Sequence, residues 1–198
     1  ICIDLETWDP NLKEKGSGWA RKDGHIVGIA LATEGWQGYF PVRHRSGGNL
    51  DEKLVFSWLK EMLSTNSDKI CHNASYDIGW LKAEGIEAKG RIIDTMVAAP
   101  LIDENRFSYS LNALGRYYLQ ESKNEELLND AAEAWNVDSK SGLSELPPMY
   151  VGPYAEQDAA LTLRLWKHFK TELSKQDLWS IFNLESSITP LLIEMRMR

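Results

Sequence analysis

Two carboxylates, Asp4 and Glu6, stand two residues apart at the end of the apolar run 1–7 that opens the chain. Apolar and β-branched residues at positions 1, 2, 3 and 5 predict a buried strand. Side chains two apart on a strand project from the same face. Neighbouring acids repel one another and are costly to desolvate unless a cation lies between them. Mg²⁺ and Mn²⁺ prefer such oxygen ligands, so the pair indicates a divalent-metal site, the alternative being two solvated acids at a strand end.

A third acid follows a second predicted strand, over residues 69–72. The sequence C-H-N-A-S-Y-D-I-G-W-L over 71–81 passes from this strand into a helix predicted for 74–83. Asn73 and Asp77 are four apart and share one face of a helical turn. The structural alternatives are an N-cap for Asn73 and a surface acid, favoured by the helix dipole, for Asp77.

The fourth acid lies near the start of a helix predicted for residues 154–173. Tyr154 and Asp158 are four apart, so a phenol and a carboxylate lie next to one another on the same helical face. Taken alone, Tyr154 is better explained as an aromatic side chain at the edge of the core.

The elements that must position these residues follow from hydrophobic periodicity and turn signals. Strands come early and helices follow, which predicts a layered α/β or α+β domain.

Two stretches, 8–24 and 137–153, are rich in turn residues and are predicted to be loops. Trp8 and Trp19 in the first loop are either base-stacking residues or anchors. The remaining predicted strands are 26–33, 36–42 (a hairpin antiparallel to the first strand) and 90–94, and the remaining helices are 51–64, 95–102, 110–119, 125–135 and 178–198.

Composition suits one soluble globular domain. The chain has 198 residues, of which 43% are hydrophobic and 26% charged, and no apolar run reaches the length of a membrane span. The net charge of −7 weakens a nucleic-acid-binding reading, but two bound divalent ions would offset four of those charges. The two cysteines, Cys2 and Cys71, both fall in predicted strands. We interpret them as small buried hydrophobic side chains of a protein in a reducing compartment.

The order D-x-E, N-x-x-x-D and Y-x-x-x-D resembles the three motifs of the tyrosine branch of the DEDD 3′-5′ exonucleases. The chain is most similar to the proofreading domain of family A DNA polymerases, the DNA polymerase I-like enzymes that include bacteriophage ones. The resemblance implies an RNase H-like fold, with a mixed five-stranded sheet flanked by helices. It also implies that residues 1–175 form an exonuclease domain. Residues 176–198 would then be the helical start of a connection to a polymerase domain, and the chain would be a fragment of a longer one. The sister branch carries a histidine at the position of Pro153, so the tyrosine branch is the one resembled.

The family's catalytic roles transfer to matching residues. Asp4 would bridge two divalent ions, Mg²⁺ or Mn²⁺, Glu6 and Asp158 would hold the ion that activates water, and Asp77 would serve the second ion. Tyr154 would orient the attacking water; with a reference pKa of ~10 it is a poor general base.

The family's substrate is a single-stranded or frayed DNA 3′ end. The residues that would touch its terminal nucleotides are Leu5, Thr7, Asn73 and Tyr76. The expected location is the cytoplasm of a bacterial or phage-infected cell, with an organelle as the alternative and no membrane association.

Two other functions fit the same motifs. An RNase D-like 3′-5′ exonuclease would share the tyrosine motif and the mechanism but trim RNA. A non-catalytic single-strand-binding module would share only the fold, and the complete set of carboxylates argues against it.

Overall fold

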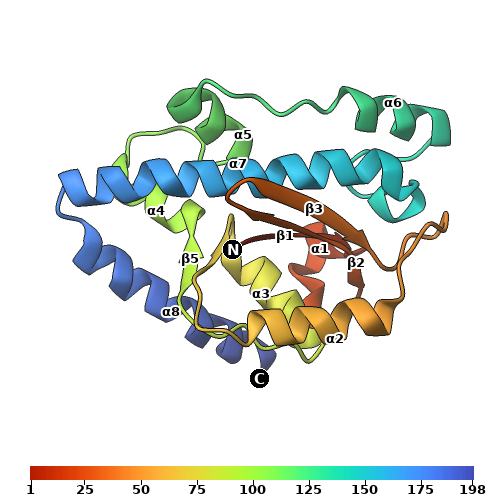
Figure 1. The fold of residues 1–198 in the computed structure, drawn as a ribbon, viewed down its shortest axis with the longest axis horizontal. Helices are drawn as coiled ribbons and strands as arrows, with labels where there is room; N and C mark the ends of the chain where they lie inside the picture. Colours follow the sequence, from red (N-terminus) through yellow and green to blue (C-terminus); the bar gives the residue numbers. More distant parts are fainter.

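The computed structural model describes all of residues 1–198 and contains one mixed five-stranded sheet (Figure 1). The strand order is β3-β2-β1-β4-β5; β1, β2 and β3 are antiparallel neighbours, and β4 and β5 run parallel to β1. This confirms the predicted RNase H-like sheet and its hairpin. The strands are β1 (Cys2–Trp8), β2 (His25–Thr33), β3 (Trp36–Pro41), β4 (Lys69–Cys71) and β5 (Ile92–Asp94).

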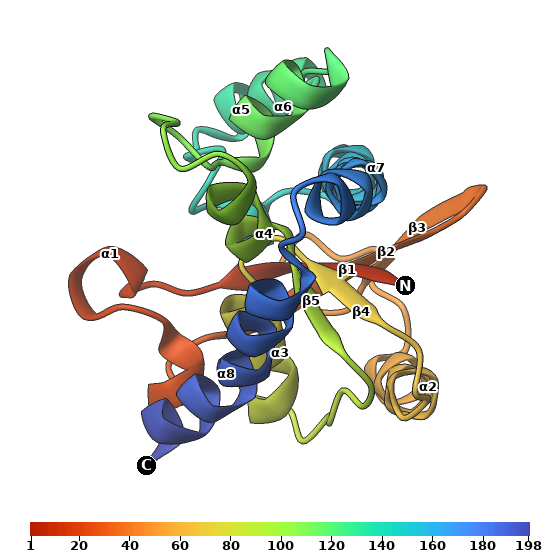
Figure 2. The same ribbon diagram turned by 90° about the vertical axis from the view of Figure 1, so that its left-hand side faces the viewer.

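Helices cover both faces of the sheet (Figure 2). Helices α4 to α7 lie on one side, α2 and α3 lie on the other, and α8 runs beside α3. Short 3₁₀ helices occupy Gly18–Arg21 and Leu143–Glu145, and a π-helical turn occupies Gly115–Leu119. The α-helices are α1 (Leu12–Lys15), α2 (Glu52–Leu63), α3 (Ala74–Ala83), α4 (Thr95–Ile102), α5 (Leu111–Leu114), α6 (Glu126–Trp135), α7 (Pro148–Lys175) and α8 (Trp179–Met197).

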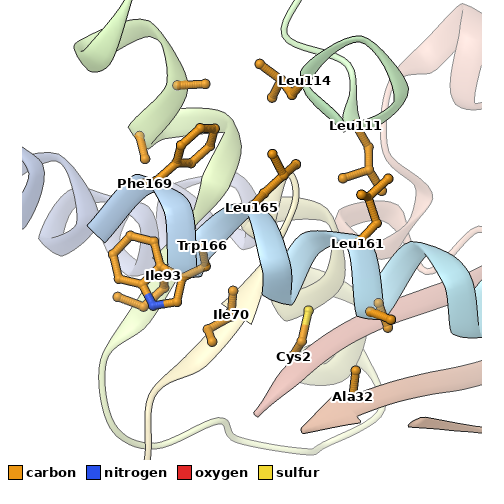
Figure 3. Close-up of a cluster of buried hydrophobic side chains, with 14 of the residues drawn as sticks. Cys2, Ala32, Ile70, Ile93, Leu111, Leu114, Leu161, Leu165, Trp166 and Phe169 are labelled. Carbon is orange, nitrogen blue, oxygen red and sulfur yellow. The ribbon is translucent and has the colours of Figure 1, made fainter. Parts of the chain in front are cut away.

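Strand β1 divides its side chains between two hydrophobic cores. Cys2 packs in the core beneath α7, which Figure 3 shows, whereas Ile3 and Leu5 pack in the core beneath α2 and α3. Because strand side chains alternate, Asp4 and Glu6 follow Cys2 and face α7. The small residues Ala30 and Ala32 of β2 are buried in the α7 core, so this helix approaches the sheet closely.

Helix α7 is longer than the sequence predicts. It begins at Pro148, and Pro153 lies inside it, so the prediction of a loop over 137–153 is wrong for its last six residues. Proline is favoured at the first helical position because its missing N–H would be unpaired there. The packing of Val151 and Ala155, both fully buried, continues the helix past Pro153.

The stretch 8–24 is also more ordered than a plain loop. It contains α1 and a 3₁₀ helix, and Trp19 is 1% exposed, where its indole fills the space above Gly79. Trp19 is therefore an anchor, and the base-stacking alternative is wrong for this residue. Trp8 lies between the ring of His25 and the guanidinium of Arg45.

Helix α8 packs along the domain. Phe182 is buried in the core beneath α7 and Ile193 in the core beneath α3. None of the helices combines the length and the hydropathy that crossing a bilayer requires.

Candidate active site at the end of strand β1

Three of the predicted acids are brought together from two elements. Asp4 and Glu6 project from β1 toward α7, and Asp158 comes from the third turn of α7. Glu6 is 7% exposed and Asp158 is 5% exposed. Burial, followed by the charge of Asp158, raises the pKa of Asp4 to about 7, and the charge of Lys123 opposes this rise. Burial, followed by the charges of Asp4 and Asp158, raises the pKa of Glu6 well above its usual range.

Asp77 joins this group through the backbone of β1. It lies in the first turn of α3, is 4% exposed, and its Oδ1 accepts a hydrogen bond of 3.1 Å from the N–H of Leu5. Burial and then the charge of Asp4 raise the pKa of Asp77, and the bond from Leu5 opposes this rise. The N–H of Leu5, a predicted contact for the substrate, is therefore occupied by a carboxylate.

The start of α3 is fixed by an acid to which the sequence assigned no role. Asp94, at the end of β5, accepts hydrogen bonds from the N–H groups of Asn73 (2.9 Å), Ala74 (2.8 Å) and Met96 (2.9 Å). Asn73 has a left-handed backbone with φ of 76°, and its side chain makes no cap bond, so the capping alternative for Asn73 is wrong. The sequence contained one indication of this role, since Asp94 ends the predicted strand that follows the strand leading into α3.

Two predicted substrate residues lie against each other beside β1. The hydroxyls of Thr7 and Tyr76 are 2.7 Å apart, and the Tyr76 hydroxyl also donates to Asp9 at 3.3 Å. Thr7, Asn73 and Tyr76 are all half-buried. Their polar groups border the strand end that carries Glu6.

A lysine that sequence reasoning missed lies inside the carboxylate cluster. Lys123 Nζ forms an ion pair with Asp158, and the two side chains are only 11% and 6% exposed. The same ammonium lies 5.0 Å from the centre of the Tyr154 ring. Nothing in the local pattern around residue 123 distinguishes this lysine from a surface one, because only the fold brings it to α7.

Tyr154 itself is held in its protonated form. Burial, followed by the charge of Asp158, raises the pKa of Tyr154 well above its usual range. The phenol is therefore a hydrogen-bond donor at neutral pH rather than a base.

A second tyrosine that sequence reasoning missed borders the site from β3. Tyr39 lies over Gly28, which is paired with Glu6 across the strands; a Cβ at Gly28 would overlap the Tyr39 hydroxyl. Tyr39 is hydrogen-bonded to His44 Nε2 at 2.7 Å, and His44 Nδ1 lies 2.8 Å from the carbonyl oxygen of Leu146. Burial, followed by the charge of Glu6, raises the pKa of Tyr39.

One fully buried carboxylate oxygen at the site has no partner within the chain. Asp158 Oδ1 is buried without a hydrogen bond. As the side chains stand, no three His, Cys, Asp or Glu residues are arranged so that they could hold a metal ion. Lys123 accounts for part of this arrangement, since its ammonium already occupies the other oxygen of Asp158.

Comparison with known proteins places the chain among polymerase-associated exonucleases. The family described as 3′-5′ exonuclease matches residues 15–174, a range that includes Asp77, Tyr154 and Asp158. The DNA-directed DNA polymerase of Pseudomonas phage M6 is 37% identical over 203 residues, which cover 100% of this chain and 31% of that protein. DNA polymerase I of Borreliella burgdorferi is 25% identical, over 86% of this chain and 18% of its own length.

A solved structure shares the fold. Brucella melitensis NrnC with bound Mg²⁺ superposes with a TM-score of 0.69 at 15% identity, covering 98% of this chain and 83% of that one. At this identity the similarity is one of fold. The chain therefore spans most of a free-standing neighbour but less than a third of the phage polymerase.

Replacing Asp94 by Asn should loosen the start of α3. An amide has one acceptor oxygen where the carboxylate has two, so either the N–H of Ala74, or those of Asn73 and Met96, lose their acceptor in a buried place. We expect a loss of about 2 kcal/mol in the free energy of unfolding, measured by urea denaturation. The matched control is Asp51→Asn at the exposed N-cap of α2, where Asn caps as well as Asp. Equal losses in the two variants would contradict the role given to Asp94.

The raised pKa of Asp4 predicts a pH dependence of stability. Between pH about 4 and about 7 the folded state binds a proton at Asp4 that the unfolded state has lost, so folding stability falls as pH rises through this window. In EDTA, Asp4→Asn should raise the melting temperature at pH 8 by a few degrees and change it little at pH 5. Asp130→Asn, an exposed acid on α6, is the control. The same shift at both pH values would show that charge at Asp4 is not its cause.

Proposed function

The chain belongs to the 3′-5′ exonuclease family of DNA polymerase I-like enzymes, and we propose that it removes nucleotides from DNA 3′ ends by two-metal-ion hydrolysis. The observation that carries this proposal is the convergence of Asp4, Glu6 and Asp158 beside Tyr154 at the end of β1. Burial raises the pKa of all three acids, and neighbouring acids raise the pKa of Asp4 and of Glu6 further, so the arrangement is costly; a set of this kind is typical of a catalytic site.

The donor chemistry of the cluster fits hard divalent cations. All of its acids offer oxygen ligands, and the unpaired Oδ1 of Asp158 lacks any donor from the protein. In our assignment Asp4 would serve both ions, Glu6 and Asp158 would hold one of them, and Asp77 would serve the other. When bound, such ions lower the pKa of water and neutralise charge that develops on the phosphate and the leaving 3′-oxygen. The structurally similar NrnC binds Mg²⁺, which supports Mg²⁺ or Mn²⁺ here.

The chain's own residues supply positioning. The protonated Tyr154 hydroxyl donates a hydrogen bond and orients the attacking water on the side of Asp158. The half-buried polar groups of Thr7, Asn73 and Tyr76 contact the sugar and phosphates of the terminal nucleotides. The backbone carbonyl of Leu5 lies on β1, the strand that also carries Thr7. Contacts to sugar and phosphate do not distinguish one base from another, so the site accepts a 3′ end of any sequence.

The proposed substrate is a single-stranded or frayed DNA end delivered by an attached polymerase domain. Both polymerase relatives are much longer than this chain, which supports a proofreading role within a larger protein. Helix α8, in the region 176–198 that we assign to the connection, exposes Leu184, Leu191, Leu192 and Met195 by 54% to 71%, an apolar surface suited to a neighbouring domain. The phage and bacterial sources of the relatives support the cytoplasm of a bacterial or phage-infected cell.

A cleavage assay tests the proposed reaction. A 5′-labelled single-stranded DNA oligonucleotide should shorten stepwise from its 3′ end with Mg²⁺ or Mn²⁺ and stay intact in EDTA. Asp4→Ala should reduce the rate at least about a hundredfold, because it removes a ligand of both ions. An RNA of the same sequence should be cut more slowly.

Three outcomes would contradict this reading. Cleavage that survives EDTA would exclude the metal ions, full activity of Asp4→Ala would exclude the assigned site, and faster cutting of RNA would place the protein with the RNA-trimming exonucleases.

Removing the Tyr154 hydroxyl should separate positioning from metal binding. Tyr154→Phe keeps the ring but loses the donor, so we expect cleavage to slow about tenfold to a hundredfold while Mn²⁺ affinity, measured by calorimetry, is unchanged. The control is Tyr150→Phe, one turn earlier on α7, where the ring packs on Trp135 and the cleavage rate should stay normal. Loss of Mn²⁺ binding in Tyr154→Phe would show that the residue acts through the metal site.

A further inference from the structure

The ammonium group of Lys123 acts on three of the four acids at the site. It is paired with Asp158 and lowers the pKa of Asp4, of Glu6 and of Asp158, opposing the rise that burial causes. Its side chain is 11% exposed, and lysine is rarely so buried without a partner. Lys123 therefore offsets part of the negative charge that the fold concentrates at the end of β1.

The backbone around Lys123 is fastened on both sides. Glu121 forms a two-bond ion pair with Arg164 of α7. Gln157 of α7 donates to the carbonyl of Ser122 (3.4 Å) and accepts from the N–H of Asn124 (2.9 Å). The N–H of Lys123 itself donates to Asn112 Oδ1 at 3.3 Å. The segment is thus held against α7 and α5, and only the four-carbon side chain is left to move.

The position of the ammonium conflicts with the proposed metal site. Its partner is Asp158 Oδ2, an oxygen of a residue that we assign as a metal ligand. Two cations at contact distance from one carboxylate repel each other strongly in a buried place. The same ammonium already lies over the face of the Tyr154 ring, 5.0 Å from its centre, so a small further movement toward the ring would release Asp158 without losing this contact.

We propose that Lys123 is a built-in counter-ion that a divalent ion must displace from Asp158, so that this lysine sets the ion concentration at which the site fills. The inference rests on the proposed function, in which these acids bind metal. Without divalent ions Lys123 stabilises the crowded carboxylates; with them it moves aside toward Tyr154. The free energy needed to separate Lys123 from Asp158 lowers the affinity of the site for the ion.

Mn²⁺ titration calorimetry of the 198-residue chain tests this exchange. Lys123→Met removes the charge and keeps the apolar stem, so its dissociation constant for Mn²⁺ should fall about tenfold. Lys123→Gln retains a hydrogen-bond donor for Asp158, and its dissociation constant for Mn²⁺ should also fall. This variant replaces Lys123→Met in the test if the Met variant does not fold. Lys123→Arg should stay within a few-fold of the parent. Lys170→Met, an exposed lysine farther along α7, is the matched control and should leave the affinity unchanged.

Thermal melting gives a readout that is independent of catalysis. In EDTA, Lys123→Met should melt below the parent because Asp158 is left buried without its partner. Saturating Mn²⁺ should then raise its melting temperature by more than it raises that of the parent. The control Lys170→Met should follow the parent in both buffers.

The outcomes separate this inference from the proposed function. Equal or weaker Mn²⁺ affinity in Lys123→Met and Lys123→Gln, beside normal binding by the parent, would overturn the counter-ion role and leave the metal site intact. Failure of the parent and of every variant to bind Mn²⁺ would overturn both. Binding by the neutral variants at Mn²⁺ concentrations where the parent stays unbound would support the exchange most strongly.

Discussion

Concentrated negative charge at one end of a buried strand is the constraint on which the rest of this structure depends. Asp4, Glu6 and Asp158 meet where water is largely excluded; burial raises the pKa of each, and neighbouring acids of the cluster raise the pKa of Asp4 and of Glu6 further. Such a cluster is tolerated only if positive charge or hydrogen-bond donors are supplied. The structure supplies the ammonium of Lys123 and the N–H of Leu5, and it leaves Asp158 Oδ1 without a partner.

The surrounding fold keeps these groups in place. Alternation along β1 sends Ile3 and Leu5 into one core and turns Asp4 and Glu6 toward α7. Small residues beneath α7 let that helix approach closely enough to bring Asp158 and Tyr154 to the strand end. Asp94 fixes the first turn of α3, and with it Asp77, through bonds to backbone N–H groups. The side chains that we propose as catalytic therefore come from rigid elements, as pre-organised sites require.

Most of the fold, and the acids that meet at the end of β1, could be predicted from the sequence because they follow local patterns. The strand D-x-E pair, the helical N-x-x-x-D and Y-x-x-x-D spacings and the hairpin each depend on a few neighbouring residues. The early start of α7 escaped prediction, since packing of Val151 and Ala155 outweighs the signal of Pro153. Lys123, Tyr39 and the capping role of Asp94 escaped it as well. Lys123 acts on Asp158, 35 positions away in the chain, and Asp94 on Ala74, 20 positions away, whereas Tyr39 reaches the site across the β2–β3 hairpin; no periodicity reports such contacts.

The most direct measurement is a crystal structure of the chain soaked in Mn²⁺, with anomalous scattering used to locate the ions. The account predicts Mn²⁺ peaks between Asp4 and the carboxylates of Glu6, Asp77 and Asp158, with Lys123 Nζ withdrawn from Asp158. A saturated crystal with no anomalous peak at the end of β1, and with Lys123 still paired to Asp158, would contradict the claim that these acids form a metal-ion site.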